Sequence, residues 1–193
     1  NGARRRAYRP CGRRSESRYG GDVSWFRRPA LPDPVRRALD LPATDRVLAS
    51  AELADGSWAV ATRAGLLTSD AGGTTVDRHL WSDVDRAGYD PESATITVSW
   101  VDGAPPLALR LADPRRTSLA QTLRERVQSS VVLSETVTFA AGLTARVAVR
   151  RDADGELFSQ VVADPGLDLT DPEVEARVDA AEGRVRSASG LPL

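Results

Sequence analysis

The sequence predicts an α+β protein in which short antiparallel strands are interrupted by one long helix and followed by a second. Three observations lead to this prediction. Residues 45–111 contain short segments of alternating apolar and polar side chains, separated by turn sequences such as Asp55-Gly56, which is the pattern of antiparallel hairpins. Residues 114–129 carry apolar side chains at the four-residue spacing of an amphipathic helix. From residue 131 the alternating pattern returns, before a last helical pattern near the end of the chain.

A short helix is expected to open at Asp33-Pro34. Asp is a good N-cap, and proline fits the first helical position, where its missing N–H costs nothing. Residues 45–54 then alternate, with Val47, Ala49, Ala51 and Leu53 on one face. Asp55-Gly56 follows them and favours a type I′ hairpin turn. The same reasoning places strands at 57–62, 65–69 and 74–80.

A second group of strands begins after the turn Trp81-Ser82-Asp83-Val84. We expect a strand at 84–89 and then the clearest strand of the chain at 94–101. It places Ile96, Val98 and Trp100 on one face and Thr95, Thr97 and Ser99 on the other. A seventh strand and the helix at 114–129 follow. Their apolar faces are formed by Leu107, Leu109 and Leu111 in the strand, and by Leu119, Leu123 and Val127 in the helix.

The C-terminal part is expected to hold three more strands, at 131–140, 143–151 and 156–163. The last two are joined by a hairpin loop, Asp152-Ala153-Asp154-Gly155, in which the glycine can adopt a positive φ. A final helix begins at Asp171-Pro172. Its apolar stripe must be buried against a neighbour, and the preceding strands are the nearest one; the stripe consists of Val174, Val178, Ala181 and Val185.

The composition limits which functions are possible. The chain has 193 residues, of which 41% are apolar, so it can bury a substantial core. A single cysteine excludes an internal disulfide and a cysteine-cluster metal site. No apolar run approaches the length of about 18 residues that a membrane-spanning helix needs. The N-terminal arm also lacks the apolar stretch of a secretory signal. We therefore expect a protein of the cytoplasm that does not enter the membrane.

Charge is distributed unevenly along the chain. All 26 basic residues are arginine, methionine is absent, and asparagine and isoleucine occur once each. The missing types have AT-rich codons, so a GC-rich genome explains the arginine excess. Residues 1–37 contain 11 arginines and three acidic residues, a net charge of +8, whereas residues 38–193 carry −9. A basic arm on an acidic body can contact nucleic acid, although the body itself repels phosphate.

The basic arm, residues 1–22, is expected to be disordered because it has too few apolar side chains to offset the entropy of ordering. A second interpretation is that it is not native protein. Gly20-Gly21-Asp22 can be encoded by a purine-rich stretch like a ribosome-binding site, and Val23 by a GTG start codon. We then expect an N-terminal segment at 23–44 that contains the short helix, a domain at 45–130 and a C-terminal sheet with its helix at 131–193.

Seven short strands followed by one amphipathic helix, together with Trp81-Ser82-Asp83-Val84, resemble a pleckstrin-homology-like (PH-like) domain of the bacterial PH/GRAM-like type. The resemblance implies a seven-stranded antiparallel barrel or sandwich closed by a capping helix. Three stretches, at 25–28, 123–133 and 150–162, also resemble an uncharacterised family of high-GC Gram-positive bacteria. That family implies a fold and a compartment but no activity.

The usual catalytic patterns are missing from the sequence. His79 is the only histidine, and we interpret it as a partly buried strand residue near Trp81. Cys11 lies in the basic arm and lacks the structured, electropositive surroundings that activate a thiol. Neither a phosphate-binding glycine loop nor a spacing typical of metal ligands is present. We predict no catalytic residue, no cofactor and no metal.

The leading hypothesis is a non-catalytic binding or scaffold protein whose ligand is another protein. The candidate docking surface is the outer face of the 114–129 helix, at Arg124, Glu125 and Gln128, with the adjoining sheet edge, where an extended peptide would add a strand. The alternative is that these side chains are simply solvated or form exposed ion pairs. Phosphoinositide binding is rejected because the loop between the first two strands is acidic. Two alternatives remain: a hydrolase that uses only carboxylates and arginines, with Asp83/Asp85, Asp90/Glu92 and Asp168/Asp171 as candidate pairs, and nucleic-acid contact through the arm.

Overall fold

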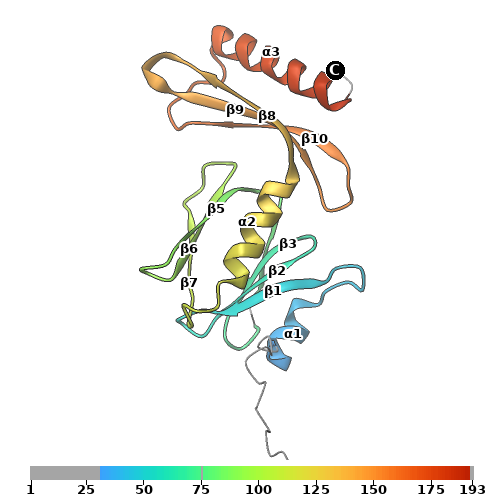
Figure 1. Ribbon diagram of the computed structural model, residues 1–193, viewed down its shortest axis with the longest axis vertical. Coiled ribbons are helices and arrows are strands. Elements are labelled where there is room, and N and C mark those ends of the chain that lie inside the picture. The colour runs from blue at the N-terminus through green and yellow to red at the C-terminus, as the bar shows by residue number, and fades with distance from the viewer. Residues whose placement is uncertain (1–30, 75, 192–193) are drawn as a thin grey trace, which may run out of the picture. The chain divides into compact units, whose positions relative to one another are not determined.

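The computed structural model describes residues 31–74 and 76–191 (Figure 1). Residues 31–193 form one compact unit. The described part is α+β, as predicted, with antiparallel sheets and three α-helices. The predictions for the basic arm, for Cys11 and for the Val23 start fall on residues outside those described.

Seven strands form two antiparallel sheets. The first has the order β1-β2-β3-β4 and the second the order β5-β6-β7. Their bounds agree closely with the predicted strands: β1 Val47–Glu52, β2 Trp58–Thr62, β3 Gly65–Ser69, β4 Val76–Leu80, β5 Val84–Asp90, β6 Thr95–Trp100 and β7 Leu107–Arg110.

The two sheets do not close into the barrel that the resemblance implied. No ladder joins β4 to β5 in the described chain, because the turn at 81–83 separates them. Within the described chain, the one backbone bridge between the two sheets lies at a corner, where Leu53 pairs with Leu111. The hydrogen bonds from Ala54 N to Arg110 O and from Ala112 N to Glu52 O flank that bridge. Beyond this corner the edge of β7 is open.

Helix α2 (Ser118–Ser130) covers the core between these sheets. Leu119 and Leu123 are fully buried and Val127 nearly so, as the predicted stripe requires. Ile96 and Val98 of β6 meet them from the second sheet, and Ala49, Ala51 and Leu66 from the first. Val47 is the exception in the predicted β1 stripe. It is 38% exposed because the strand bulges between Val47 and Ala49.

Helix α1 (Asp33–Leu39) packs on the outer face of the first sheet, where Val35 and Leu39 contact Trp58 and Leu67. The prediction that Asp33 caps this helix is wrong. The N-cap is Pro32, and no side chain caps the helix. Asp33 is instead the first helical residue, where its carboxylate still favours the positive end of the helix dipole.

The turn after β1 also differs from the predicted type I′ hairpin. Gly56 has φ +83°, but Asp55 is not among the residues with positive φ, and type I′ requires positive φ at both central positions. Gly56 N donates to Leu53 O, and Leu53 N donates to Ser57 O. These bonds define a three-residue loop in which the glycine is the left-handed residue.

The C-terminal region is a third antiparallel sheet, in the order β10-β9-β8, covered on one face by helix α3. The elements are β8 Val131–Thr138, β9 Thr144–Arg151, β10 Leu157–Ala163 and α3 Pro172–Ser189. Asp171 caps α3 as predicted, accepting hydrogen bonds from Glu173 N and Val174 N. Val178, Ala181 and Val185 are buried against the sheet, which confirms the predicted packing partner.

The opposite face of this third sheet meets the rest of the unit through polar side chains. Arg150 of β9 is only 3% exposed. Its guanidinium donates to the backbone oxygens of Trp81 (2.8 Å), Val84 (3.0 Å) and Ser82 (3.2 Å), and to the side chains of Ser130 and Gln160. Arg146 of the same strand pairs with Asp85 of β5. We call this set of contacts the Arg150 junction.

Candidate functional site

The predicted docking surface lies on the exposed side of α2. Arg124, Glu125 and Gln128 are all exposed. Glu125 accepts a hydrogen bond from Gln121 Nε2 at 2.9 Å and forms no ion pair with a described arginine. The three residues share a solvated helix face, but none of them lines a described cleft. Their role in docking stays a prediction.

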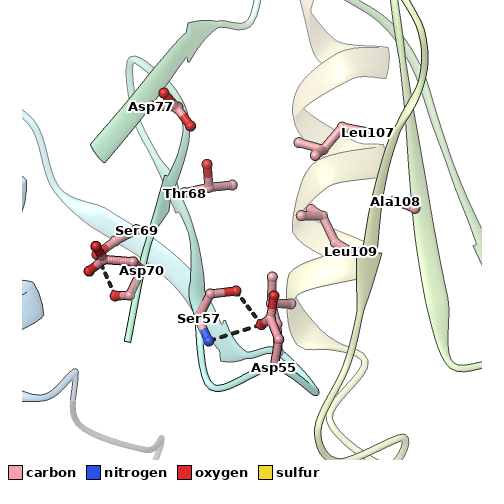
Figure 2. Close-up of a pocket in the computed structure, with 10 residues that line it drawn as sticks. Asp55, Ser57, Thr68, Ser69, Asp70, Asp77, Leu107, Ala108 and Leu109 are labelled. Atoms are coloured by element: carbon pink, nitrogen blue, oxygen red, sulfur yellow. Dashed lines mark hydrogen bonds between the residues drawn. The ribbon is translucent and has the colours of Figure 1, made fainter. Parts of the chain in front are cut away.

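A cleft of about 270 Å³ opens between the first sheet and the free edge of β7 (Figure 2). We call it the β7 cleft. One wall is polar and comes from the β1–β2 turn, β3 and β4; the other is apolar and comes from β7. The lining residues are Leu53, Asp55, Ser57, Thr68, Ser69, Asp70, Asp77, Leu107, Ala108 and Leu109.

The two walls follow from strand register. Thr68 of β3 pairs with Asp77 of β4, and the pair two residues along the strands is Leu66 with His79. Leu66 is buried in the core between the two sheets. Because side chains alternate along a strand, Thr68 and Asp77 lie on that same inner face. Figure 2 shows them facing Leu107 and Leu109 across the cleft.

Three carboxylates make the polar wall acidic. Asp55 accepts hydrogen bonds from the hydroxyl and the backbone N–H of Ser57, which hold the pKa of Asp55 below its ordinary value. Asp70 accepts a bond from Thr74 N at 2.7 Å. Asp77 is exposed and makes no hydrogen bond or ion pair within the described chain. No described lining residue is basic, so the cleft favours a cation.

The backbone of β7 adds hydrogen-bonding capacity to the cleft. Leu111 N donates to Ala94 O, on the β6 side, whereas Arg110 O accepts from Ala54 N, on the opposite side. Backbone groups of successive residues in a strand point alternately to the two neighbours. Ala108 therefore directs its N–H and C=O away from β6, toward the cleft. A strand that entered the cleft could pair with these two groups.

His79 lies beside the β7 cleft rather than in it. It is half-buried on β4, as predicted, and its ring contacts Trp100. The two ring centroids are 4.4 Å apart at an interplanar angle of 32°. Trp100 Nε1 donates to Pro105 O at 3.1 Å, which fixes the indole. The contact joins β4 to β6 next to the cleft.

The carboxylates of the pairs considered from the sequence serve turns, a helix cap and, at Asp85, an ion pair. Asp90 accepts from Ser93 Oγ and Glu92 N, and Asp168 accepts from Thr170, which lowers the pKa of both carboxyl groups. Asp83 accepts from Leu80 N, while Asp85 pairs with Arg146. The structure therefore does not bring Asp83 and Asp85 to one shared partner. Asp152 closes the predicted β9–β10 hairpin by accepting from Asp154 N and Glu156 N.

Within residues 31–74 and 76–191, no three His, Cys, Asp or Glu side chains gather where they could hold a metal ion. None of the helices in that part of the chain is long and apolar enough to cross a membrane. The chain matches no protein-family model, no curated protein and no solved structure. The predicted nucleic-acid contact falls on the arm, outside the described residues. We therefore take the β7 cleft, with its acidic wall, apolar wall and open strand edge, as the candidate site.

Sequence reasoning identified only part of this cleft. It recognised the acidic loop at Asp55, but Asp77 and Thr68 carried no signal beyond strand alternation. Leu107 and Leu109 were expected to be core residues, yet they also form the apolar wall because β7 has an open edge. The buried Arg150 was also missed. Arginines interrupting a strand otherwise made of valine and alanine, RVAVRR, are the one signal that could have indicated it.

Proposed function

We propose that this chain is a non-catalytic protein-binding module of the cytoplasm, with residues 45–130 arranged as a PH-like domain. The arrangement is supported by the order of seven antiparallel strands and one helix, and by α2 covering the core between the two sheets. The observation that carries the function is the β7 cleft. It combines an open strand edge, an apolar wall and the carboxylate of Asp77, which has no partner within the described chain.

The partner that fits this cleft is an extended peptide segment with a basic side chain. Its backbone would pair with the N–H and C=O of Ala108, adding a strand to the β5-β6-β7 sheet. An inward-facing arginine or lysine would direct its charge to Asp77. Its aliphatic stem would pack on Leu107 and Leu109, since long basic side chains bury the stem and keep the charged end near polar groups.

The acidic wall supports this partner over a phosphate-bearing one. Asp55, Asp70 and Asp77 would repel an anionic headgroup or a nucleic-acid backbone. Hydrogen bonds from Ser57 lower the pKa of Asp55 still further below neutral pH, where the carboxylate is charged. Two backbone hydrogen bonds and one partly solvated ion pair give only a weak complex. Its affinity depends on how many further side chains of the peptide pack on the apolar wall.

Fluorescence anisotropy with labelled synthetic peptides tests this proposal. The probes are peptides in which arginine alternates with valine, and matched peptides in which glutamate replaces arginine. We expect the arginine peptides alone to bind, and Asp77→Lys to weaken that binding by about tenfold or more. Glu125→Lys makes the same change of charge on α2 and should leave binding unaltered.

Binding of both peptide sets with equal affinity, or no effect of Asp77→Lys, would refute the cleft as the docking site. Loss of binding in Glu125→Lys with retention in Asp77→Lys would instead place docking on the α2 face of Arg124, Glu125 and Gln128.

A further inference from the structure

Strand β10 is an open edge of the third sheet, and its backbone directions can be assigned. Asp164 N donates to Thr144 O of β9 at 2.9 Å. Counting back along the strand, Val162, Gln160 and Phe158 therefore also face β9. Ser159 and Val161, with Leu157 and Ala163 at the ends, direct their N–H and C=O groups outward. No hydrogen bond from elsewhere in the described chain reaches these outward groups.

This edge lacks the features that usually prevent strand pairing. Natural edge strands are protected by charged side chains, proline, bulges or a covering element. The seven residues of β10, LFSQVVA, include no charge and no proline, and the β9–β10 register is regular. By contrast, β4 carries Asp77 and Arg78, and Arg177 of α3 donates to Thr138 O on the edge strand β8.

Every residue of β10 is half-buried. Helix α3 covers β9 and β8, and it reaches β10 through Glu182 and Arg186, which both contact Ser159. Leu157, Val161 and Ala163 pack against the α3 core, and each stays partly exposed. The apolar surface of β10 thus remains partly uncovered, which is the condition under which an added strand would bury more of it.

The flank of α3 above this edge carries a second, independent feature. A hollow of about 300 Å³ is lined by Asp179, Glu182, Gly183 and Arg186. Asp179 is exposed and has no partner in the described chain. The order of these residues along the helix is acidic, acidic, glycine, basic. If the α3 helices of two copies lie side by side and antiparallel, Asp179 of each copy faces Arg186 of the other. The small Gly183 then lies between these two Asp–Arg pairs.

We infer that β10 is the docking edge for a second copy of this chain. The two β10 strands pair antiparallel about a two-fold axis at Gln160, so that Ser159 faces Val161 and Phe158 faces Val162 of the other copy. Leu157 then faces Ala163, and no charge is opposed at any position. The result is one continuous sheet through both copies, with an isologous interface.

The spacing of the helices agrees with this arrangement. Because α3 reaches both β8 and β10, its axis lies near β9. The two α3 axes would then be three strand spacings apart, or about 14 Å. That is a few ångströms more than the 8–10 Å of directly packed helices, a gap that the Asp179 and Arg186 side chains can span. Self-complementarity in both the strand and the helix favours a second copy over an unrelated strand.

Sedimentation velocity on the full chain, over a wide range of concentrations, tests the inference. We expect a concentration-dependent dimer. Val161→Pro removes an outward N–H that β9 does not use, and should give a monomer with an unchanged circular dichroism spectrum. Asp179→Arg places two arginines opposite each other at both ends of the helix flank and should weaken the dimer by about tenfold.

Ala180→Arg is the matched control, because Ala180 is exposed on the β8 side of α3 and lines a different hollow. It should leave the dimer intact. A wild-type chain that stays monomeric at every concentration would overturn the inference. So would a dimer that persists in Asp179→Arg and dissociates in Ala180→Arg. If Val161→Pro fails to fold, Asp179→Arg still decides between these outcomes.

Discussion

The two interfaces inside this unit are built in opposite ways. The first and second sheets meet through an apolar core in which Leu119, Leu123, Ile96 and Val98 are fully buried. The third sheet meets them through the Arg150 junction, where one guanidinium hydrogen-bonds three backbone carbonyls and two side chains. An apolar core tolerates any neighbour of suitable volume, whereas a polar junction requires particular atoms at particular positions.

Within the described residues, no carboxylate hydrogen-bonds the buried guanidinium of Arg150. Burial lowers the pKa of Arg150, the nearby charge of Arg146 lowers it further, and Asp83 opposes the change. Arginine stays protonated under all ordinary conditions, so its charge must be balanced by dipoles. The carbonyls of Trp81 and Val84 supply them. The comparison shows that directional hydrogen bonds, more than buried apolar area, hold the third sheet against the first two.

Removal of core volume should cause the largest loss of stability. Leu123→Ala empties a fully buried site between α2 and both sheets, and we expect a loss of about 3 kcal/mol in the free energy of unfolding. Urea denaturation measures it. Leu80→Ala, at a position that is 57% exposed, is the control and should change stability by less than about 0.5 kcal/mol. Equal losses in the two variants would contradict the assigned core.

Removal of the guanidinium should have a smaller and more local effect. Arg150→Met keeps the aliphatic volume but leaves buried carbonyls without donors, for which we expect a loss of about 2 kcal/mol. Hydrogen exchange should rise in β8–β10 and α3 more than in the first two sheets. Arg151→Met is the control, because Arg151 is exposed and bonds only Gly155 O in its own hairpin. Uniform exchange through the chain would show that the junction does not separate two regions.

The smallest expected effect is on acid stability. Arg184 donates to Glu135 and holds the pKa of that carboxyl group below its ordinary value of 4.5. A lowered folded-state pKa gives a stabilisation that is present above pH 4.5 and is lost as pH falls through the folded-state pKa. Melting temperatures of Glu135→Gln should therefore fall less steeply with acidification than those of the wild type. Glu156→Gln, in the β9–β10 turn, should retain the wild-type slope.

Most of the fold could be predicted because it follows from local periodicity. Alternation at Ile96 and Val98 marked β6, the spacing of Leu119, Leu123 and Val127 marked α2, and Asp171-Pro172 marked the start of α3. The type of turn at Asp55-Gly56 was harder to predict, because type I′ turns and three-residue loops favour the same residues. The β7 cleft was harder still to predict. Asp77 and Leu107 are far apart in sequence, and they face each other only because the two sheets do not close at β7.

By itself, the sequence determined the positions of the strands and helices and the apolar face of each, because those depend on residues a few positions apart. It also determined the acidic character of the loop at Asp55. Only the tertiary structure decided that the sheets stay open at β7, that Arg150 is buried among carbonyls, and that β10 is left as an edge. Each of these features depends on contacts between segments that are distant along the chain. A local sequence pattern does not determine which distant segments come together in space.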